Sequence, residues 1–399
     1  MIQNNHGIFS FFSGVGMLDL GFEHSGFEIS FVNEFYHHFM NGYKHSREVL
    51  KHKEPNFGCH LCSIEDFLLD SRKASLLASS IEAMRRSGKK VGFIGGPPCP
   101  DFSIGGKNKG SSGKNGVLSG SYFEIIKRYQ PDFFLFENVK GLWRTKKHRA
   151  YYESLKNEMV KENYFISDKL INAMEYGSPQ DRERIILLGF HRRLFGESNR
   201  REKISTCTID FPWSLKKVYD TTDIFSLPWP QKSPFIESSD FPCPDGLIKE
   251  LTVQEWFTKN DVENHPNSEH CFKPRAGLAK FKMVEEGDDS RKSSKRLHRW
   301  RYSPTACYGN NEVHLHPYKA RRLSVSEALA IQSMPINFEL PSSMSFSSMF
   351  KSVGNGVPYL AAKSLAKSID TFISSLDKNS IILSVNQDLT EENQMSMFL

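Results

Sequence analysis

Short apolar runs recur through the first half of the chain, and amphipathic stretches with helical periodicity separate them. Apolar runs of about four to eight residues that end in turn residues are typical of buried strands. Alternation of such strands with helices favours a doubly wound, mostly parallel sheet, so the expected fold class is α/β. The predicted strands cover residues 8–12, 29–32, 91–94, 133–136 and 184–190.

Polar and reactive residues directly follow these predicted strands. The turn Ser13-Gly14-Val15-Gly16 follows the first strand, and Glu34 lies at the carboxyl end of the second. Cys99 follows the third strand, and Glu137 follows the fourth. Ligands of open α/β sheets bind just beyond the carboxyl ends of the strands. We therefore expect the functional site at this edge of the sheet.

The character of the sequence changes after residue 190. Proline, serine, lysine and tryptophan become frequent and helical periodicity weakens, which predicts a second, smaller domain of short strands and loops. A Ser-x-x-Glu capping box at Ser324 and Glu327 opens a helix through Ser333, and a final helix is expected at about 357–373. The predicted organisation is a first domain of residues 1–190 and 352–375, a second domain with a hinge over 191–351, and a polar tail over 376–399.

Composition narrows the class of protein. The chain has 399 residues, a net charge of +6 and a pI near 8.8, which tolerates a polyanionic partner without requiring one. No run approaches the roughly 20 apolar residues of a membrane span, and the amino terminus lacks a signal-peptide pattern. The seven cysteines are an odd number, which argues against a secreted disulfide framework. We expect a cytoplasmic protein with reduced thiols and no membrane partner.

Cys99 is the leading candidate for a reactive group. Its thiol follows a Gly-Gly-Pro-Pro turn among polar residues, whereas inert cysteines are usually buried in apolar surroundings. The Gly/Ser/Lys-rich segment 105–114 suits a lid that closes over a phosphate backbone. Glu137 ends an apolar strand, where a carboxylate is costly unless it has a partner or a function. Arg182 and Arg184 alternate as they lead into the last predicted strand, so both can point to one face of it and bind anions or orient a carboxylate. Each feature alone also fits packing, a salt bridge or surface charge.

Gly14 and Gly16 form a weak nucleotide-binding signature. A dinucleotide fingerprint needs a third glycine three residues on, and position 19 is Asp. The strand–turn–helix context nevertheless fits a nucleoside, because Glu34 about 20 residues later can accept hydrogen bonds from ribose hydroxyls. A nucleoside pocket is therefore expected, and NAD is not specifically indicated.

Taken in order, these segments resemble the DNA (cytosine-5)-methyltransferases, particularly the bacterial enzymes of restriction–modification systems. The resemblance covers about residues 7–190 and 320–365, and the ordered set is far more specific than any one motif. It implies a Rossmann-like methyltransferase domain that binds S-adenosyl-L-methionine, with a target-recognition domain that reads double-stranded DNA. The matching segments are 11–16, 33–34, 96–99, 137–140, 180–185, 322–327 and 353–358.

The resemblance also implies roles for the reactive residues. The Cys99 thiolate would add to carbon 6 of a cytosine flipped out of the duplex, which makes carbon 5 able to attack the methyl donor. Glu137 would hydrogen-bond the exocyclic amine and N3 of the base. Arg184 would grip the base or position Glu137, and Arg182 would support the same site. The implied lid runs from Pro100 to Ser119 and brings Ser103 and Lys107 to the DNA.

Three departures from the family pattern concern the cofactor and the lid. Met17 stands where a further glycine is common, and Ser63 stands where an Asp usually reaches the adenine amine, a task for which Asp66 is the available substitute. Asn115 replaces a frequent lid arginine. The cofactor-binding residues implied by the resemblance are Phe12, Gly14, Gly16, Glu34, Phe35, Ile64, Pro98 and Asn355.

Target reading is expected in residues 191–320. The basic run from Arg291 to Arg301 stands beside Trp300 and Tyr302, a combination suited to phosphate contact and base-edge reading. Ser303-Pro304-Thr305 resembles the family's short recognition element. Arg301 and Thr305 are therefore expected to contact DNA.

Other functions remain open from the sequence. A tRNA cytosine methyltransferase shares these motifs, but the Cys-Phe-Thr element typical of that branch is missing. A catalytically dead DNA-binding protein is disfavoured because Cys99, Glu137 and Arg184 are all present. Cys59 and Cys62 have a zinc-like spacing that no second pair completes, so no metal is expected. We expect a monomer, with any cognate restriction endonuclease acting separately.

Overall fold

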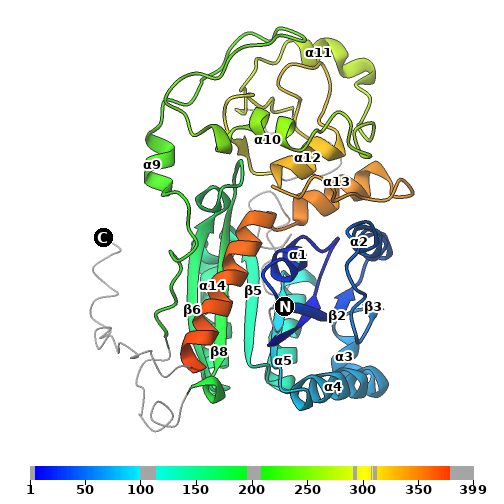
Figure 1. Cartoon of the computed structure of the whole chain (residues 1–399), viewed down its shortest axis with the longest axis vertical. Coiled ribbons are helices and arrows are strands. Elements are labelled where there is room, and N and C mark those ends of the chain that lie inside the picture. Colours follow the sequence, from blue (N-terminus) through cyan, green and yellow to red (C-terminus); the bar gives the residue numbers. More distant parts are fainter. Residues whose placement is uncertain are drawn as a thin grey trace.

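The structure is a computed structural model that describes residues 5–98, 114–195, 208–290, 294–306, 308 and 312–377. Two lobes are visible, one built on a sheet and one composed mainly of loops and short helices (Figure 1). Helix α14 (Tyr359–Asp377) returns from the loop-rich lobe to lie along the sheet.

A seven-stranded sheet forms the first lobe, with the order β3-β2-β1-β4-β5-β8-β6. The strands from β3 to β5 pair in parallel, whereas β8 runs antiparallel to both β5 and β6. All five predicted strands are present, so the mostly parallel α/β fold is confirmed. The strands are β1 (His6–Phe11), β2 (Glu28–Glu34), β3 (Cys59–Leu61), β4 (Lys90–Gly95), β5 (Phe133–Val139), β6 (Tyr164–Asn172) and β8 (Glu183–His191).

Helices cover both faces because the central strands are apolar on both sides. In β5, Phe133 and Leu135 belong to one buried cluster, whereas Phe134 and Phe136 belong to the other. Helices α1 (Met17–Glu23) and α14 cover the first face. The second face is covered by α4 (Ser71–Arg86), α5 (Lys114–Tyr129) and α7 (Lys146–Lys161). Shorter or peripheral helices are α2 (His37–Val49), α3 (Asp66–Leu69) and α6 (Lys140–Arg144).

The second lobe has less regular structure than the sequence predicts. Its one named strand, among the described residues, is β9 (Ser303–Pro304), which pairs with β7 (Gln180–Asp181) of the first lobe. Buried arginine side chains, rather than neighbouring strands, donate hydrogen bonds to backbone carbonyls in this lobe. The fully buried Arg296 donates to the carbonyls of Phe281 and Val284. The helices are α9 (Thr221–Ser226), α10 (Val253–Lys259), α11 (Leu278–Lys282), α12 (Val325–Ile331) and α13 (Phe346–Asn355).

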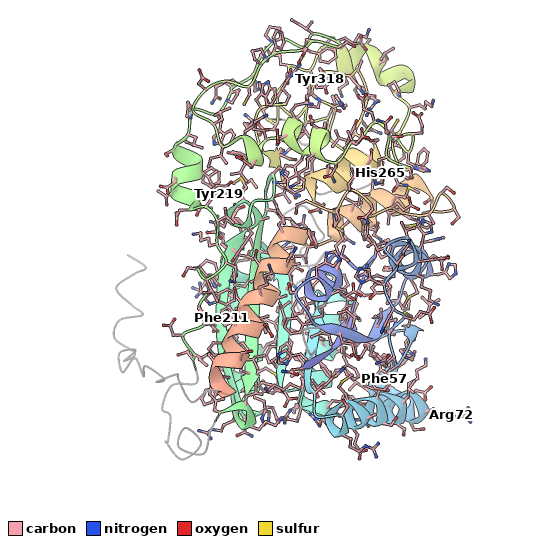
Figure 2. All side chains as sticks on the ribbon, viewed as in Figure 1. Phe57, Arg72, Phe211, Tyr219, His265 and Tyr318 are labelled. Atoms are coloured by element: carbon pink, nitrogen blue, oxygen red, sulfur yellow. The ribbon has the colours of Figure 1, made fainter. Side chains whose placement is uncertain are left out.

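The boundary between the lobes does not coincide with residue 190. Ile209 donates its backbone N–H to Ile166 of β6 at 2.9 Å, and the ring of Phe211 packs against Phe372 of α14 (Figure 2). Residues 208–213 therefore pack on the sheet, although the sequence placed them in the second domain. The predicted capping box is present, because Ser324 and Glu327 exchange side-chain and backbone hydrogen bonds at the start of α12.

Candidate active site

Glu137 and Arg184 meet at the edge of the sheet. Arg184 lies opposite Val139 in the antiparallel pairing of β5 and β8, so its side chain shares a face with Glu137. The Arg184 Nε atom lies 3.0 Å from Glu137 Oε1, and both side chains are largely buried. A guanidinium in this position fixes the direction of the carboxylate.

The turn after β4 approaches the same carboxylate. A Cβ atom added to Gly96 would lie 2.9 Å from Glu137 Oε2, so the missing side chain at Gly96 makes room for Glu137. Pro97 and Pro98 continue this turn toward Cys99. Cys99, Ser103 and Lys107 lie outside the described residues.

A second set of groups lies where β1 and β2 end. The two carboxylate oxygens of Glu34 accept hydrogen bonds from the backbone N–H groups of Gly14 and Tyr36, each at 2.8 Å. A carboxylate has about four acceptor positions, so both oxygens can still accept further hydrogen bonds. Burial raises the pKa of the Glu34 carboxyl, and the N–H groups of Tyr36 and Gly14 oppose that shift.

The turn itself is shaped for close approach by a ligand. Phe12, Gly14 and Gly16 all have positive φ, at 54°, 59° and 83°. Around Gly14, nothing described lies within 4 Å of where a side chain would begin, so this backbone faces open space. Phe35 beside it is 62% exposed. An open glycine turn, an anchored carboxylate and an exposed aromatic ring fit a nucleoside cofactor.

The far end of the chain reaches this pocket. Lys351 of α13 lies over the ring of Tyr36 at 4.8 Å, and Asn355 follows one helical turn later on an exposed position. A Cβ atom on Gly356 would lie 2.1 Å from Met17 Sδ. Met17, which departs from the family pattern, is therefore accommodated by a glycine on the opposing segment.

The other predicted cofactor residues are less clearly placed. Ile64 is almost fully buried in the core cluster beneath α4 and α5. Ser63 accepts a hydrogen bond from the backbone N–H of Glu65. The Asp66 carboxylate forms an ion pair with Lys73 at 2.5 Å. Asp66, the expected substitute for the family's adenine-binding Asp, is therefore already paired.

Arg182 makes its hydrogen bonds at the junction between the two lobes. It falls between β7 and β8, where the strand is interrupted, and its guanidinium donates to the carbonyls of Ala306 (3.3 Å) and Gly354 (3.0 Å). Thr305 is also tied to this segment, because its Oγ1 donates to the Asp181 carbonyl at 2.6 Å.

The described part of the basic run is largely internal. Arg299 is 2% exposed and pairs with Glu286 at 2.8 Å. Arg301 donates to the carbonyl of Gly287 and pairs with Asp289, each at 3.1 Å. These arginines brace loops of the second lobe, so their sequence pattern does not by itself mark a free DNA-binding surface.

Sequence reasoning missed a buried network beneath the glycine turn. Arg47 Nη2 donates to the Gly16 carbonyl at 2.8 Å, and Arg47 Nε pairs with Glu23 at 2.9 Å. Asp19 is fully buried and accepts from Ser10, and burial raises the pKa of Asp19 to about 6. The clue in the sequence was the pair of charged residues, Asp19 and Glu23, in the otherwise apolar helix α1.

Cys59 and Cys62 are partly buried packing residues at and beyond β3. Burial raises the pKa of the Cys59 thiol to about 11, and the His60 ring between them stacks on Phe31 at 4.3 Å. Among the residues that the structure describes, no cluster of three or more His, Cys, Asp or Glu could hold a metal ion. No described helix is long and apolar enough to cross a membrane.

The fold and pocket define the class of protein. The methyltransferase EhMeth of Entamoeba histolytica superposes with a TM-score of 0.55 at 14% identity, over 93% of this chain and 99% of that chain. The Dnmt2 methyltransferase of S. pombe gives 0.52 at 13% identity, over 93% and 99%. Such distant likeness shows the fold alone, which this chain shares with these two methyltransferases.

Sequence comparison identifies the family within that class. The C-5 cytosine-specific DNA methylase family matches residues 7–371. The Type II methyltransferase M.NmeDI of Neisseria meningitidis serogroup C is 52% identical over 369 residues, which cover 92% of this chain and 84% of the relative. M.FnuDI of Fusobacterium nucleatum is 28% identical over 383 residues, covering 93% and 96%. The chain belongs to the C-5 cytosine-specific DNA methylase family; it is a DNA (cytosine-5)-methyltransferase, and its methyl donor is S-adenosylmethionine.

Proposed function

We propose that this enzyme methylates one cytosine within a specific duplex sequence through a covalent Cys99 adduct, and that it protects host DNA in a restriction–modification system. The observation that carries the proposal is the Glu137–Arg184 pair, which faces the Gly96–Pro98 turn that leads to Cys99. The protective role is supported by the 52% identical relative, a Type II methyltransferase.

Each residue of the site has a distinct task. The Cys99 thiolate adds to carbon 6 of the flipped cytosine while Glu137 donates a proton to N3, which leaves carbon 5 enamine-like. Arg184 holds Glu137 in line with the base. When bound, S-adenosylmethionine supplies an electrophilic methyl group to carbon 5. A base then removes the carbon 5 proton as the Cys99 thiolate leaves carbon 6, and N3 returns its proton to Glu137, which restores the aromatic ring.

The proposed cofactor contacts are those that the family resemblance implies, and the glycine turn and Glu34 support them. Glu34 accepts the ribose hydroxyls, and the backbone around Gly14 and Gly16 receives the methionine part. Phe35 stacks on the adenine. The proposed set is completed by Phe12, Ile64, Pro98 and Asn355.

DNA contacts are proposed on the lid and the second lobe. Ser103 and Lys107 would reach the phosphates, whereas Arg301 and Thr305 would shape base reading. The proposed division is chemistry and cofactor binding in residues 1–190 and 352–375, joined by residues 208–213 that pack on the sheet, and recognition within 214–351. We further propose that the enzyme acts as a cytoplasmic monomer, with a separate cognate endonuclease.

A mechanism-based trap tests the covalent step. A cognate duplex carrying 5-fluorocytosine should form a stable complex with the wild type in the presence of S-adenosylmethionine, because fluorine blocks the final elimination. Cys99→Ala should form none, while its circular-dichroism spectrum matches the wild type. A covalent complex with Cys99→Ala would refute the assignment, and equal labelling of a tRNA substrate would refute the preference for DNA. Bisulfite sequencing of DNA from expressing cells identifies the modified site.

A further inference from the structure

Two buried amide side chains link the end of the second lobe to the turn that carries Asn355. Gln180 Oε1 accepts from the backbone N–H of Ala306 at 3.0 Å, and Gln180 Nε2 donates to Gln332 Oε1 at 3.0 Å. Gln332 Nε2 in turn donates to the carbonyl of Val353. Both glutamines are fully buried.

The direction of this relay is fixed at its two ends. A backbone N–H can only donate and a backbone carbonyl can only accept, so Ala306 requires the oxygen of Gln180 and Val353 requires the amide nitrogen of Gln332. The remaining oxygen and nitrogen then face each other. Reversing either amide would place like atoms together at a buried site, which costs a buried hydrogen bond.

Arg182 forms a second link between the same two segments. Its guanidinium donates to the carbonyls of Ala306 and Gly354, and the side chain is 2% exposed. The two segments also touch directly, because a Cβ atom on Gly354 would lie 3.3 Å from the Ala306 carbonyl oxygen. The Ala306 peptide is therefore held on both its N–H and its C=O side.

We propose that Gln180, Gln332 and Arg182 are positioning residues that couple the recognition segment 303–306 to the cofactor-facing turn Val353–Gly356. The inference rests on the proposed roles of Thr305 in DNA recognition and Asn355 in cofactor binding. Because the relay touches both segments, loosening it at any point allows both to shift. We therefore expect a substitution in the relay to weaken binding of DNA and binding of the cofactor together.

Steady-state kinetics on the full chain test the coupling. Gln332→Met has nearly the same length but breaks both amide contacts. We expect it to raise KM for cognate duplex and KM for S-adenosylmethionine by about three- to tenfold each, the range set by one buried hydrogen bond. With both substrates saturating, kcat should stay within about twofold of the wild type, since Arg184 and Glu137 are untouched.

A double-mutant cycle separates coupling from simple loss of stability. Gln180→Met should reproduce the effect, and the double variant should be no worse than the more affected single variant, because both interrupt one relay. Gln332→Asn, which is one methylene too short to span both partners, gives the same test if the Met variants do not fold. Additive effects, or variants that each move only one KM, would overturn the proposal.

Two controls distinguish this failure from a failure of the proposed site. Ser352→Ala removes a buried hydrogen bond to the Met349 carbonyl within the same helix but leaves the relay intact, so both KM values should remain within about twofold of the wild type. Asn355→Ala should raise KM for S-adenosylmethionine alone. If it does not, the cofactor role of Asn355 is wrong, whereas the glutamine cycle still shows whether the two KM values move together.

Discussion

Gly96→Ala is the substitution that most directly tests the geometry of the reacting groups. The added Cβ atom would lie 2.9 Å from Glu137 Oε2. Gly96 has no left-handed φ, so alanine fits its backbone, and among the described residues the close conflict is with the carboxylate. Non-bonded atoms attract best at about 3.5 Å or more, so Glu137 must retreat by roughly 0.5 Å.

This displacement of Glu137 should change folding stability little but lower the reaction rate strongly. The Glu137 carboxylate is the free end of a side chain, so it can move at little cost to folding. Its contact with Arg184 is 3.0 Å, however, and a shift of about half an ångström exceeds the tolerance of a catalytic group. Since a misplacement of about 1 Å can cost roughly 10²-fold, we expect kcat to fall by about 10- to 100-fold.

Single-turnover methylation of a labelled cognate duplex measures this loss. KM for S-adenosylmethionine should change far less than kcat, because Glu34, Gly14 and Gly16 at the ends of β1 and β2 are untouched and Pro98 alone of the proposed cofactor residues shares the turn with Gly96. Gly120→Ala is the matched control: its Cβ atom meets only Tyr151 Oη at 3.4 Å, and alanine within α5 should stabilise the helix by about 0.5–1 kcal/mol. A Gly96→Ala enzyme with wild-type kcat would show that the Glu137 position does not limit the chemistry.

Three further outcomes are expected. Glu137→Gln should lower the single-turnover rate by about 10²-fold or more with unchanged calorimetric affinity for S-adenosylmethionine; wild-type turnover would exclude the proton-donor role. Burial raises the pKa of Glu34, and the ionised carboxylate accepts the ribose hydroxyls. KM for S-adenosylmethionine should therefore rise as pH falls through that raised pKa. Glu34→Gln should remove this dependence of KM on pH. Thr305→Ala should relax the methylated sequence and lower Tm slightly, because it removes the hydrogen bond to the Asp181 carbonyl, and Arg301→Ala should do the same through its lost contacts to Gly287 and Asp289. Genome-wide methylation profiles and thermal melts check both variants, and full site stringency in both would contradict their role in base reading.

The core of the fold could be predicted because its strands are apolar on both faces. In β5 every residue from Phe133 to Phe136 is buried, so the run is visible without any periodicity. Strand β6 escaped prediction because a polar block interrupts its apolar residues: Ser167, Asp168 and Lys169 are consecutive and less buried than the two ends of the strand. Strand β3 is only three residues long and carries no such signal.

The cofactor pocket could be predicted only in part. Glu34 and the glycine turn were visible because a strand end and its spacing define them. The support from Arg47 was not, since nothing in a helix sequence indicates that a side chain will reach the Gly16 carbonyl across 31 residues. Charge is equally ambiguous in the second lobe, where Arg296 and Arg299 satisfy buried carbonyl and carboxylate groups.

In the segment Gln180–Arg184 the sequence reveals the motif but not the different contacts of its two arginines. Alternate residues of a continuous strand share a face, so Arg182 and Arg184 were expected to act on one site. The strand is interrupted between β7 and β8, and the two guanidinium groups diverge: Arg184 reaches Glu137, whereas Arg182 reaches the carbonyls of Ala306 and Gly354. A single stretch of five residues therefore contacts both the reacting carboxylate and the junction between lobes.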